Sequence, residues 1–365
     1  MNIALQEQSF SADGAALLPV RLRGIGTAVP PHTLPQDLVR TNAERILGPR
    51  YPEFARLSQS FLASGIERRY SVVPFEWFEE EHNWPERTKA YLEGATKLFI
   101  DAASKALEHS GLKAEDIDTI VTVSSTGIAT PTLEARAMRE LSFRQDVKRV
   151  PVFGIGCAGG VSGLSIAKRL AKGEPGSNVL LVAVETCTLA FRADRLQKAD
   201  IIATVLFGDG AAAVVLSSGD GEGPVLGDGS EFTWPDTLSI MGWDVDKDGF
   251  GVIFDRSIPN FAKANLKEAV EAGYKAGGIT ADDLTRLICH PGGAKVVEAI
   301  EEAMDLPAES LDHERTVLRD YGNMSAPTAL FVLGRVMENS PKGQMMLIAL
   351  GPGFTASTMP IDFGS

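Results

Sequence analysis

The sequence predicts an α/β fold built from two similar halves, and two kinds of observation support this. Apolar stretches of strand length at 117–125, 178–186 and 284–290 alternate with stretches of helical spacing. Apolar strands without alternation are typical of sheets that helices cover on both faces. In addition, one spacing of chemically notable residues occurs twice along the chain. We therefore expect layered, duplicated α/β halves.

The composition indicates a globular protein with a large core. The chain has 365 residues, 44% of them hydrophobic, enough for two domains or one double-layered domain. We expect a cytoplasmic protein with no membrane span, because no long apolar run and no secretory leader occur. Three scattered cysteines fit free thiols. The net charge of −13 argues against a nucleic-acid partner, although a local basic patch could bind coenzyme A.

The elements before residue 150 can be assigned in chain order. We expect a loose arm over 1–20, a strand over 20–25, a broken helix over 36–61, a helix over 89–110 closed by Gly111, a strand over 117–125 and a helix over 129–141. Arg68 and Arg69 stand together between the first two helices. Adjacent arginines are typical of a solvated face, or they meet a phosphate.

Cys157 lies where a strand meets a helix. A buried apolar strand is expected over 150–155, glycines then permit a tight turn, and helical spacing follows over 165–172. A thiol in the first turn of a helix faces unpaired N–H groups and the positive end of the helix dipole, which favours the thiolate. Cys157 is therefore a candidate nucleophile. The alternative is a small apolar residue packed in a turn.

The alternation continues to the end of the chain. We expect strands over 178–186 and 205–216, an acidic hairpin after 237, a helix over 261–277, a strand over 284–290, a helix over 326–338 and a strand over 345–350. Five glycines within 219–229 mark the best boundary. We therefore predict one half over residues 1–228 and another over residues 229–365.

The repeat predicts that three reactive side chains lie close together. Ser124 precedes Cys157 by 33 residues, and His290 precedes Asn323 by 33 residues. Cys157 and Asn323 each precede a helix that leads through Lys-Gly to a strand. In halves related by a pseudo-dyad, Cys157, His290 and Asn323 would converge. A thiolate with two donors for an oxyanion suits thioester chemistry. The Pro-Gly-Gly turn after His290 would expose its imidazole.

Two other patterns compete with a thioester site. The glycines of 154–159, with Glu185 ending the next strand, match a dinucleotide fingerprint and would indicate an NAD-binding oxidoreductase. That reading gives no role to the three converging residues. The aspartates of 244–249 resemble a calcium loop, but their flanks predict strands rather than helices, so a solvated acidic hairpin is favoured.

Five motifs resemble the type III polyketide synthases, the chalcone and stilbene synthase family. They are GCAGG around Cys157, LFGDGAAA at 206–213, HPGG at 290–293, YGNMSAPT at 321–328 and GPGF at 351–354. The resemblance runs in order from about residue 20 to the C-terminus. It implies a thiolase-like αβαβα fold, a homodimer, and a catalytic triad of Cys157, His290 and Asn323.

The resemblance also implies the reaction. Cys157 would take a starter acyl group from its coenzyme A ester. His290 and Asn323 would hold the malonyl thioester oxygen while decarboxylation gives an enolate, which attacks the Cys157 thioester. Binding the enolate oxygen is the task of an oxyanion hole, so we expect malonyl-CoA and acyl-CoA as substrates and no metal or redox cofactor.

Further residues are implied to line the substrate cavity. Phe207 matches the gating phenylalanine of the family, and Val252 falls nearest to a second gate that has no aromatic counterpart here, which would open the site. The other expected lining residues are Ser125, Cys187, Ala190, Gly242 and Ser325. For coenzyme A, only Arg56 lies near a match to the basic entrance residues of the family, and Arg68 and Arg69 are substitutes.

The expected starter follows from the size of the cavity. The resemblance places Ala190 where chalcone synthase has a threonine, and the smaller side chain would leave room for a longer acyl chain. Each methylene of that chain that is buried contributes roughly 0.8 kcal/mol. These departures resemble bacterial long-chain alkylresorcinol and alkylpyrone synthases, which implies a fatty acyl-CoA starter. The alternatives are an aromatic product line, such as tetrahydroxynaphthalene or phloroglucinol synthesis, and a catalytically silent binding protein of the same fold.

Overall fold

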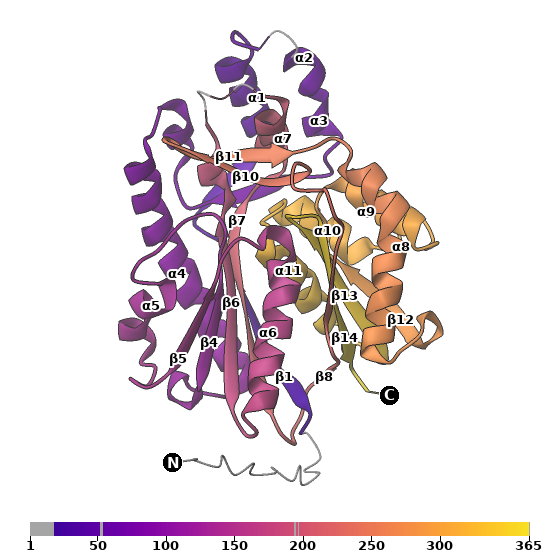
Figure 1. The fold of residues 1–365 in the computed structure, drawn as a ribbon. Helices are drawn as coiled ribbons and strands as arrows, with labels where there is room; N and C mark the ends of the chain where they lie inside the picture. The colour runs from indigo at the N-terminus through magenta and orange to yellow at the C-terminus, as the bar shows by residue number, and fades with distance from the viewer. Residues whose placement is uncertain (1–17, 52–53, 193–194, 196, 365) are drawn as a thin grey trace, which may run out of the picture.

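The protein folds around one mixed β-sheet (Figure 1). The computed structural model describes residues 18–51, 54–192, 195 and 197–364, so most of the predicted arm over 1–20 lies outside the described residues. Within these ranges ten strands form the sheet, in the order β12-β13-β14-β8-β1-β7-β6-β4-β5, with β9 paired to β14. Their bounds are Val20–Ala28 (β1), Thr119–Val123 (β4), Lys148–Val152 (β5), Asn178–Thr186 (β6), Asp209–Ser218 (β7), Val225–Leu226 (β8), Ser230–Thr233 (β9), Leu284–Cys289 (β12), Gln344–Gly351 (β13) and Thr355–Asp362 (β14).

The two halves of the sheet repeat one pairing pattern. In the first half β4 is parallel to β6, β6 is antiparallel to β7, and β7 is antiparallel to β1. In the second half β12 is parallel to β13, β13 is antiparallel to β14, and β14 is antiparallel to β8. Strands β1 and β8 pair with each other and join the halves. The predicted duplication is confirmed.

Helices cover both faces of this sheet. Helices α6 (Gly159–Gly173) and α11 (Ala326–Met337) lie side by side against the inner face, and their close approach leaves no room for a Cβ atom at Gly160, which would lie 2.3 Å from the Ala326 carbonyl oxygen. Helices α4 (Trp84–Ser110) and α5 (Leu133–Leu141) cover the outer face of the first half, and α8 (Ile258–Gly277) and α9 (Ala294–Ala303) that of the second (Figure 1). This is the thiolase-like arrangement.

Strand β6 shows why the apolar runs lack alternation. Its residues Val179, Leu181 and Ala183 pack toward α6 and α11, whereas Leu180 and Val182 pack toward α4. Since successive side chains of a strand point to opposite faces, a strand covered on both sides must be apolar throughout.

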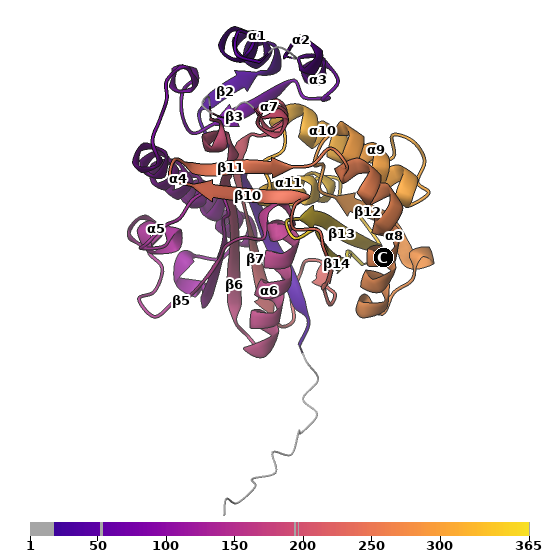
Figure 2. The ribbon, with the colours of Figure 1, turned by 45° about the horizontal axis from the view of Figure 1, so that its top comes forward.

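The remaining helices gather at one end of the molecule. Helices α1 (Gln36–Leu47), α2 (Phe54–Leu57) and α3 (Gln59–Leu62) form the predicted broken helix. They lie near α7 (Lys198–Leu206) and the hairpin of β10 (Met241–Asp246) and β11 (Gly249–Phe254) (Figures 1 and 2). Helix α10 (Asp312–Tyr321) precedes α11, and β2 (His32–Pro35) pairs with β3 (Arg68–Ser71).

Helix α4 begins earlier than its apolar spacing predicts. Asn83 caps it, since the Asn83 side chain accepts from the Glu86 N–H while the Glu86 carboxylate accepts from the Asn83 N–H. Pro85 in its first turn also suits a helix start. Its predicted end is confirmed, because Gly111 adopts a left-handed conformation there.

Two strand predictions need correction. Residues 205 and 206 end helix α7, and the strand behind the Gly-Asp-Gly turn begins at Asp209, because the apolar run spans both elements. The strand before Cys157 is not buried either. It is the edge strand β5, and Phe153 just after it is 55% exposed.

The acidic hairpin is confirmed, with Asp244 and Asp246 on strand β10. Arg192 and Arg195 form ion pairs with its carboxylates. Among the described residues, no group of three His, Cys, Asp or Glu side chains is arranged to hold a metal ion. None of the helices in the described ranges combines the length and apolarity that crossing a bilayer requires.

Candidate active site

Cys157 lies in a tight turn between β5 and α6. The turn needs glycine at 156, because its φ is +53° and a Cβ there would lie 2.6 Å from the Pro352 ring. The Ser125 hydroxyl accepts from the N–H groups of Gly154 and Gly156, at 3.2 and 3.1 Å. The fold thus holds the thiol rigidly in the interior, where Cys157 is 8% exposed.

The pseudo-dyad brings His290 and Asn323 to the same place. His290 follows β12, Asn323 follows α10, and the two residues line one small cavity together with Cys157. The Cys157 Sγ lies 4.0 Å from the Asn323 Oδ1, and the Asn323 Nδ2 donates to the Gly292 carbonyl at 3.1 Å. The sequence repeat therefore predicted the convergence of these three side chains correctly.

The imidazole of His290 is buried rather than exposed. His290 is 4% exposed, and neither ring nitrogen has a hydrogen-bond partner among the described residues. Burial lowers the pKa of His290 to about 4, so the ring is neutral at pH 7. A neutral imidazole keeps one N–H to donate, and here that N–H has no competing acceptor.

The Cys157 thiol is also neutral in the resting protein. Burial raises the pKa of Cys157 to about 11, although hydrogen bonds with Ser325 and Asn323 act to lower it. The expectation that the start of the helix ionises the sulfur is therefore wrong for the free protein. Cys157 lies in a 3₁₀ turn just before α6, and the desolvation of its charge outweighs the helix dipole.

We expect the alkylation of Cys157 by iodoacetamide to rise steadily between pH 7 and pH 10. Only the thiolate reacts, and below a pKa of about 11 its fraction grows about tenfold per pH unit. Mass spectrometry of the Cys157 peptide would report the rate separately from Cys187 and Cys289. A plateau already reached at pH 7 would contradict the resting thiol.

The ring of Phe254 lines the triad cavity. Phe207, at the end of α7, packs its ring against Trp243 and Phe254, with centroids 6.3 and 6.5 Å apart. Val252 is buried in β11 opposite Trp243 and adds no ring. The ring that Val252 lacks is supplied by Phe254, which lies two residues along the same strand and lines the triad cavity.

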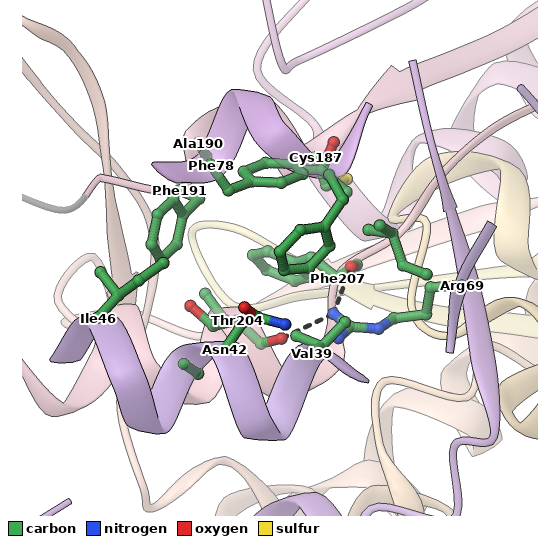
Figure 3. Close-up of a pocket in the computed structure, with 15 residues that line it drawn as sticks. Val39, Asn42, Ile46, Arg69, Phe78, Cys187, Ala190, Phe191, Thr204 and Phe207 are labelled. Atoms are coloured by element: carbon green, nitrogen blue, oxygen red, sulfur yellow. Dashed lines mark hydrogen bonds between the residues drawn. The ribbon is translucent and has the colours of Figure 1, made fainter. Parts of the chain in front are cut away.

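Phe207 also lines an apolar chamber (Figure 3). It lies between α1 and α7, and most of the side chains that line it are apolar. Cys187 and Ala190 line it, as does Phe207. Burial raises the pKa of Cys187 well above its usual value, and the charges of Glu185 and Asp209 add to this effect.

The remaining predicted lining residues occupy different positions. Ser325 borders the triad, and its N–H donates to the Asn323 Oδ1 at 2.8 Å. Ser125 supports the Cys157 turn. Gly242 pairs with Ile253 in the hairpin, next to Met241, which lines the triad cavity.

A basic groove reaches the triad from the surface. Its volume is about 610 Å³, and Gly292 belongs both to this groove and to the triad cavity. Arg56, the predicted coenzyme A contact, lines it together with Lys198, Arg256 and Lys295. Sequence reasoning missed these three cations because they come from separate elements and form no local cluster in the sequence.

Arg68 and Arg69 have separate environments. Arg68 pairs with Asp320 at 3.1 Å, with about half of its side chain exposed. Arg69 is 2% exposed, and its guanidinium donates to the carbonyl oxygens of Thr204 and Phe207. The predicted solvated face is therefore wrong for Arg69, because alternation along β3 turns its side chain inward.

Glu185 is a site residue whose role the sequence suggested wrongly. Its carboxylate accepts from the Ser125 N–H and the Thr126 hydroxyl, at 2.9 and 2.7 Å. Burial raises the pKa of Glu185 to about 8, and its charge in turn contributes to raising the pKa of Cys157. A carboxylate enclosed in this way cannot bind a ribose, so the dinucleotide reading fails on geometry.

The chain is similar to known proteins over most of its length. Residues 6–220 match the N-terminal domain of chalcone and stilbene synthases, and residues 230–362 match the C-terminal domain. The 1,3,6,8-tetrahydroxynaphthalene synthase of Streptomyces peucetius subsp. caesius is 37% identical over 341 residues, which cover 91% of this chain and 90% of that protein. A putative chalcone synthase of Bacillus subtilis (strain 168) is 33% identical over 351 residues, covering 92% and 96%.

A solved structure shows the same architecture. The crystal structure of 1,3,6,8-tetrahydroxynaphthalene synthase from Streptomyces coelicolor A3(2), a bacterial type III polyketide synthase, superposes with a TM-score of 0.89 and 26% identity. The superposition covers 94% of this chain and 99% of that one.

Proposed function

The chain belongs to the chalcone and stilbene synthase family of type III polyketide synthases, which are condensing acyltransferases, and from this premise we propose that Cys157, His290 and Asn323 are its catalytic triad. The observation that carries the proposal is their convergence on one buried cavity. In the proposed division, the half over 1–228 supplies the nucleophile and the half over 229–365 supplies the two donors.

The first step loads the starter. The Cys157 sulfur attacks the thioester carbonyl of an acyl-CoA while its proton passes to the neutral imidazole of His290. The tetrahedral intermediate then collapses, the bond to the coenzyme A sulfur breaks, and the proton returns to that sulfur. Because Cys157 and His290 are both neutral at rest, the buried cavity holds no ion pair before the substrate arrives.

The second step forms the carbon–carbon bond. The free N–H of His290 and an N–H of Asn323 donate to the malonyl thioester oxygen, the malonyl carboxylate leaves as carbon dioxide, and its bond electrons form the enolate. The enolate carbon attacks the acyl carbonyl on Cys157, and the Cys157 sulfur leaves as thiolate. Because the two N–H donors are already in place before the reaction, they stabilise the enolate oxygen without any rearrangement of the site.

Coenzyme A esters fit the basic groove. Arg56, Lys198, Arg256 and Lys295 line it, and these four cations match the phosphates of the coenzyme. The net charge of −13 makes such a local cluster necessary for an anionic substrate. The groove shares Gly292 with the triad cavity, so the thioester end of the coenzyme A ester would meet His290 and Asn323.

We infer a long-chain acyl starter, with cyclisation to an alkylresorcinol or alkylpyrone. The apolar chamber past Cys187 and Ala190 supports this, because an aliphatic chain attached to Cys157 would be buried there. A second candidate is an aromatic product made without a long starter. The names of the tetrahydroxynaphthalene synthases among the relatives favour that candidate.

An Ala190→Phe variant separates these candidates. With malonyl-CoA present, we expect the unaltered protein to extend palmitoyl-CoA, and the variant to lose at least tenfold in kcat/KM for palmitoyl-CoA while acetyl-CoA changes by less than about threefold, because the added ring fills the chamber. Products would be identified by mass spectrometry. Formation of an aromatic product from malonyl-CoA alone, with no use of palmitoyl-CoA, would establish the second candidate instead.

We also propose a homodimer. The exposed apolar side chains Phe153 and Ile128 stand near the edge strand β5, at 55% and 54% exposure, and a second copy would cover them. Light scattering of the purified protein measures its mass directly.

A further inference from the structure

The end of helix α7 is held by donors from distant parts of the chain. A helix leaves its last four carbonyl groups without partners inside the helix. Here the Val205 oxygen accepts from the Gln36 Nε2 at 3.0 Å, and the Leu206 oxygen accepts from the Asn323 N–H at 2.8 Å. The Thr204 oxygen and the Phe207 oxygen just beyond the helix both accept from the Arg69 Nη1, at 2.7 and 2.8 Å (Figure 3).

The Arg69 side chain packs closely against the backbone around it. A Cβ atom at Gly322 would lie 2.7 Å from the Arg69 Cγ, and one at Gly208 would lie 3.3 Å from its Cβ, so both glycines make room for the stem of Arg69. Burial lowers the pKa of Arg69 to about 10, opposed by the nearby Asp209, which leaves it charged at neutral pH. A cation is favourable at the C-terminal end of a helix.

Asp209 forms hydrogen bonds with the chain just after β3 and with the wall of the substrate chamber. Its carboxylate accepts from the N–H of Val72 at 2.9 Å, and from the N–H and hydroxyl of Thr188 at 2.8 and 2.6 Å. Thr188 lies next to Cys187 and lines the chamber. Arg69 therefore bonds β3 to the end of α7, and Asp209 bonds the chain just after β3 to the chamber wall.

The end of α7 and the catalytic asparagine form one unit. Besides the bond from the Asn323 N–H to Leu206, the Gly208 N–H donates to the Asn323 carbonyl at 3.0 Å, so Phe207 and Asn323 are bridged as in a short parallel strand pair. Any shift of the helix end must displace Asn323. Cys157, by contrast, is carried by the turn before α6 and supported by Ser125.

We propose that Arg69 is a positioning residue that fixes the end of α7 and thereby places Asn323 and Phe207 for decarboxylation of the malonyl group. This role rests on the proposed function of the triad. A displacement of 1 Å can cost about 100-fold in rate, so a displaced Asn323 should slow decarboxylation strongly. Loading of Cys157 should change little, because neither the Cys157 turn nor Ser125 contacts Arg69 in the described hydrogen-bond network.

The test compares two steps in Arg69→Met and Arg69→Lys. Decarboxylation is followed as acetyl-CoA released from malonyl-CoA, and loading as the mass gained by Cys157 from palmitoyl-CoA and, separately, from acetyl-CoA. We expect Arg69→Met to lower kcat for decarboxylation about 100-fold and loading by less than about threefold. Arg69→Lys should recover part of the loss, because it keeps the charge and a donor but not the planar fork.

Two further variants keep the test decisive if Arg69→Met does not fold. Gln36→Leu removes the other side-chain donor to the end of α7 and should lower the same step about tenfold. Arg315→Met removes another partly buried arginine, which pairs with Glu301 and donates to no carbonyl of α7 in the described hydrogen bonds, and it should leave the ratio of the two steps unchanged. The role of Arg69 would be overturned if Arg69→Lys and Gln36→Leu slowed decarboxylation and loading equally. It would also be overturned if neither variant slowed decarboxylation. Absence of both reactions in the unaltered protein would overturn the proposed function as well.

Discussion

Replacing Cys157 with alanine is expected to abolish condensation, with a loss of at least about 10⁴-fold in the rate of product formation. Without the sulfur no acyl-enzyme forms, and no other thiol can replace it. Cys289 is fully buried in the core of the second half, and Cys187 lines the chamber rather than the cavity that His290 and Asn323 line. The change removes one atom from a buried turn, so the fold should persist.

The same variant contains its own control. Decarboxylation of malonyl-CoA needs the two donors but not the thiol, so Cys157→Ala should still release acetyl-CoA from malonyl-CoA. Retained extension of an acyl-CoA starter by Cys157→Ala would show that the nucleophile lies elsewhere.

Replacing Asn323 with alanine should have the second largest effect. We expect decarboxylation to fall about 10²–10³-fold, since removing one donor of an oxyanion hole typically costs this much. The enolate oxygen would keep His290 alone. Because the Asn323 side chain also accepts from Ser325 and donates to Gly292, the melting temperature of the variant should be recorded beside its rate.

An asparagine at the surface supplies the comparison. Asn339 is exposed just beyond α11, and its amide donates only to the Arg335 carbonyl among the bonds described. Asn339→Ala should leave decarboxylation unchanged. If Asn323→Ala decarboxylates malonyl-CoA as fast as the unaltered protein, the assignment of Asn323 to the oxyanion hole is wrong.

The sequence could predict the elements whose pattern is strong and local. Strand β6 is apolar throughout because both of its faces are covered, and the 33-residue spacing located Cys157, His290 and Asn323 because each half repeats the same path. Gly111 ended α4 as its backbone freedom predicts.

Other features depend on contacts that no local pattern records. The apolar run at 205–216 crosses from α7 into β7, and only the tertiary donors at the end of α7 decide where the helix stops. The ionisation of Cys157 was predicted from the helix dipole alone, yet desolvation is the larger effect. Arg68 and Arg69 look alike in the sequence, and only alternation along β3 separates a surface ion pair from a buried cap.

The central claim is tested most directly by mass spectrometry of the Cys157 peptide in two stages. Incubation with an acyl-CoA, palmitoyl-CoA and acetyl-CoA being tried in turn, should add that acyl mass to Cys157 and to no other residue. A chase with malonyl-CoA should then lengthen or discharge the bound group and release an extended polyketide. If neither acyl group is found on Cys157 while polyketide is still produced, the thioester account of this site is contradicted.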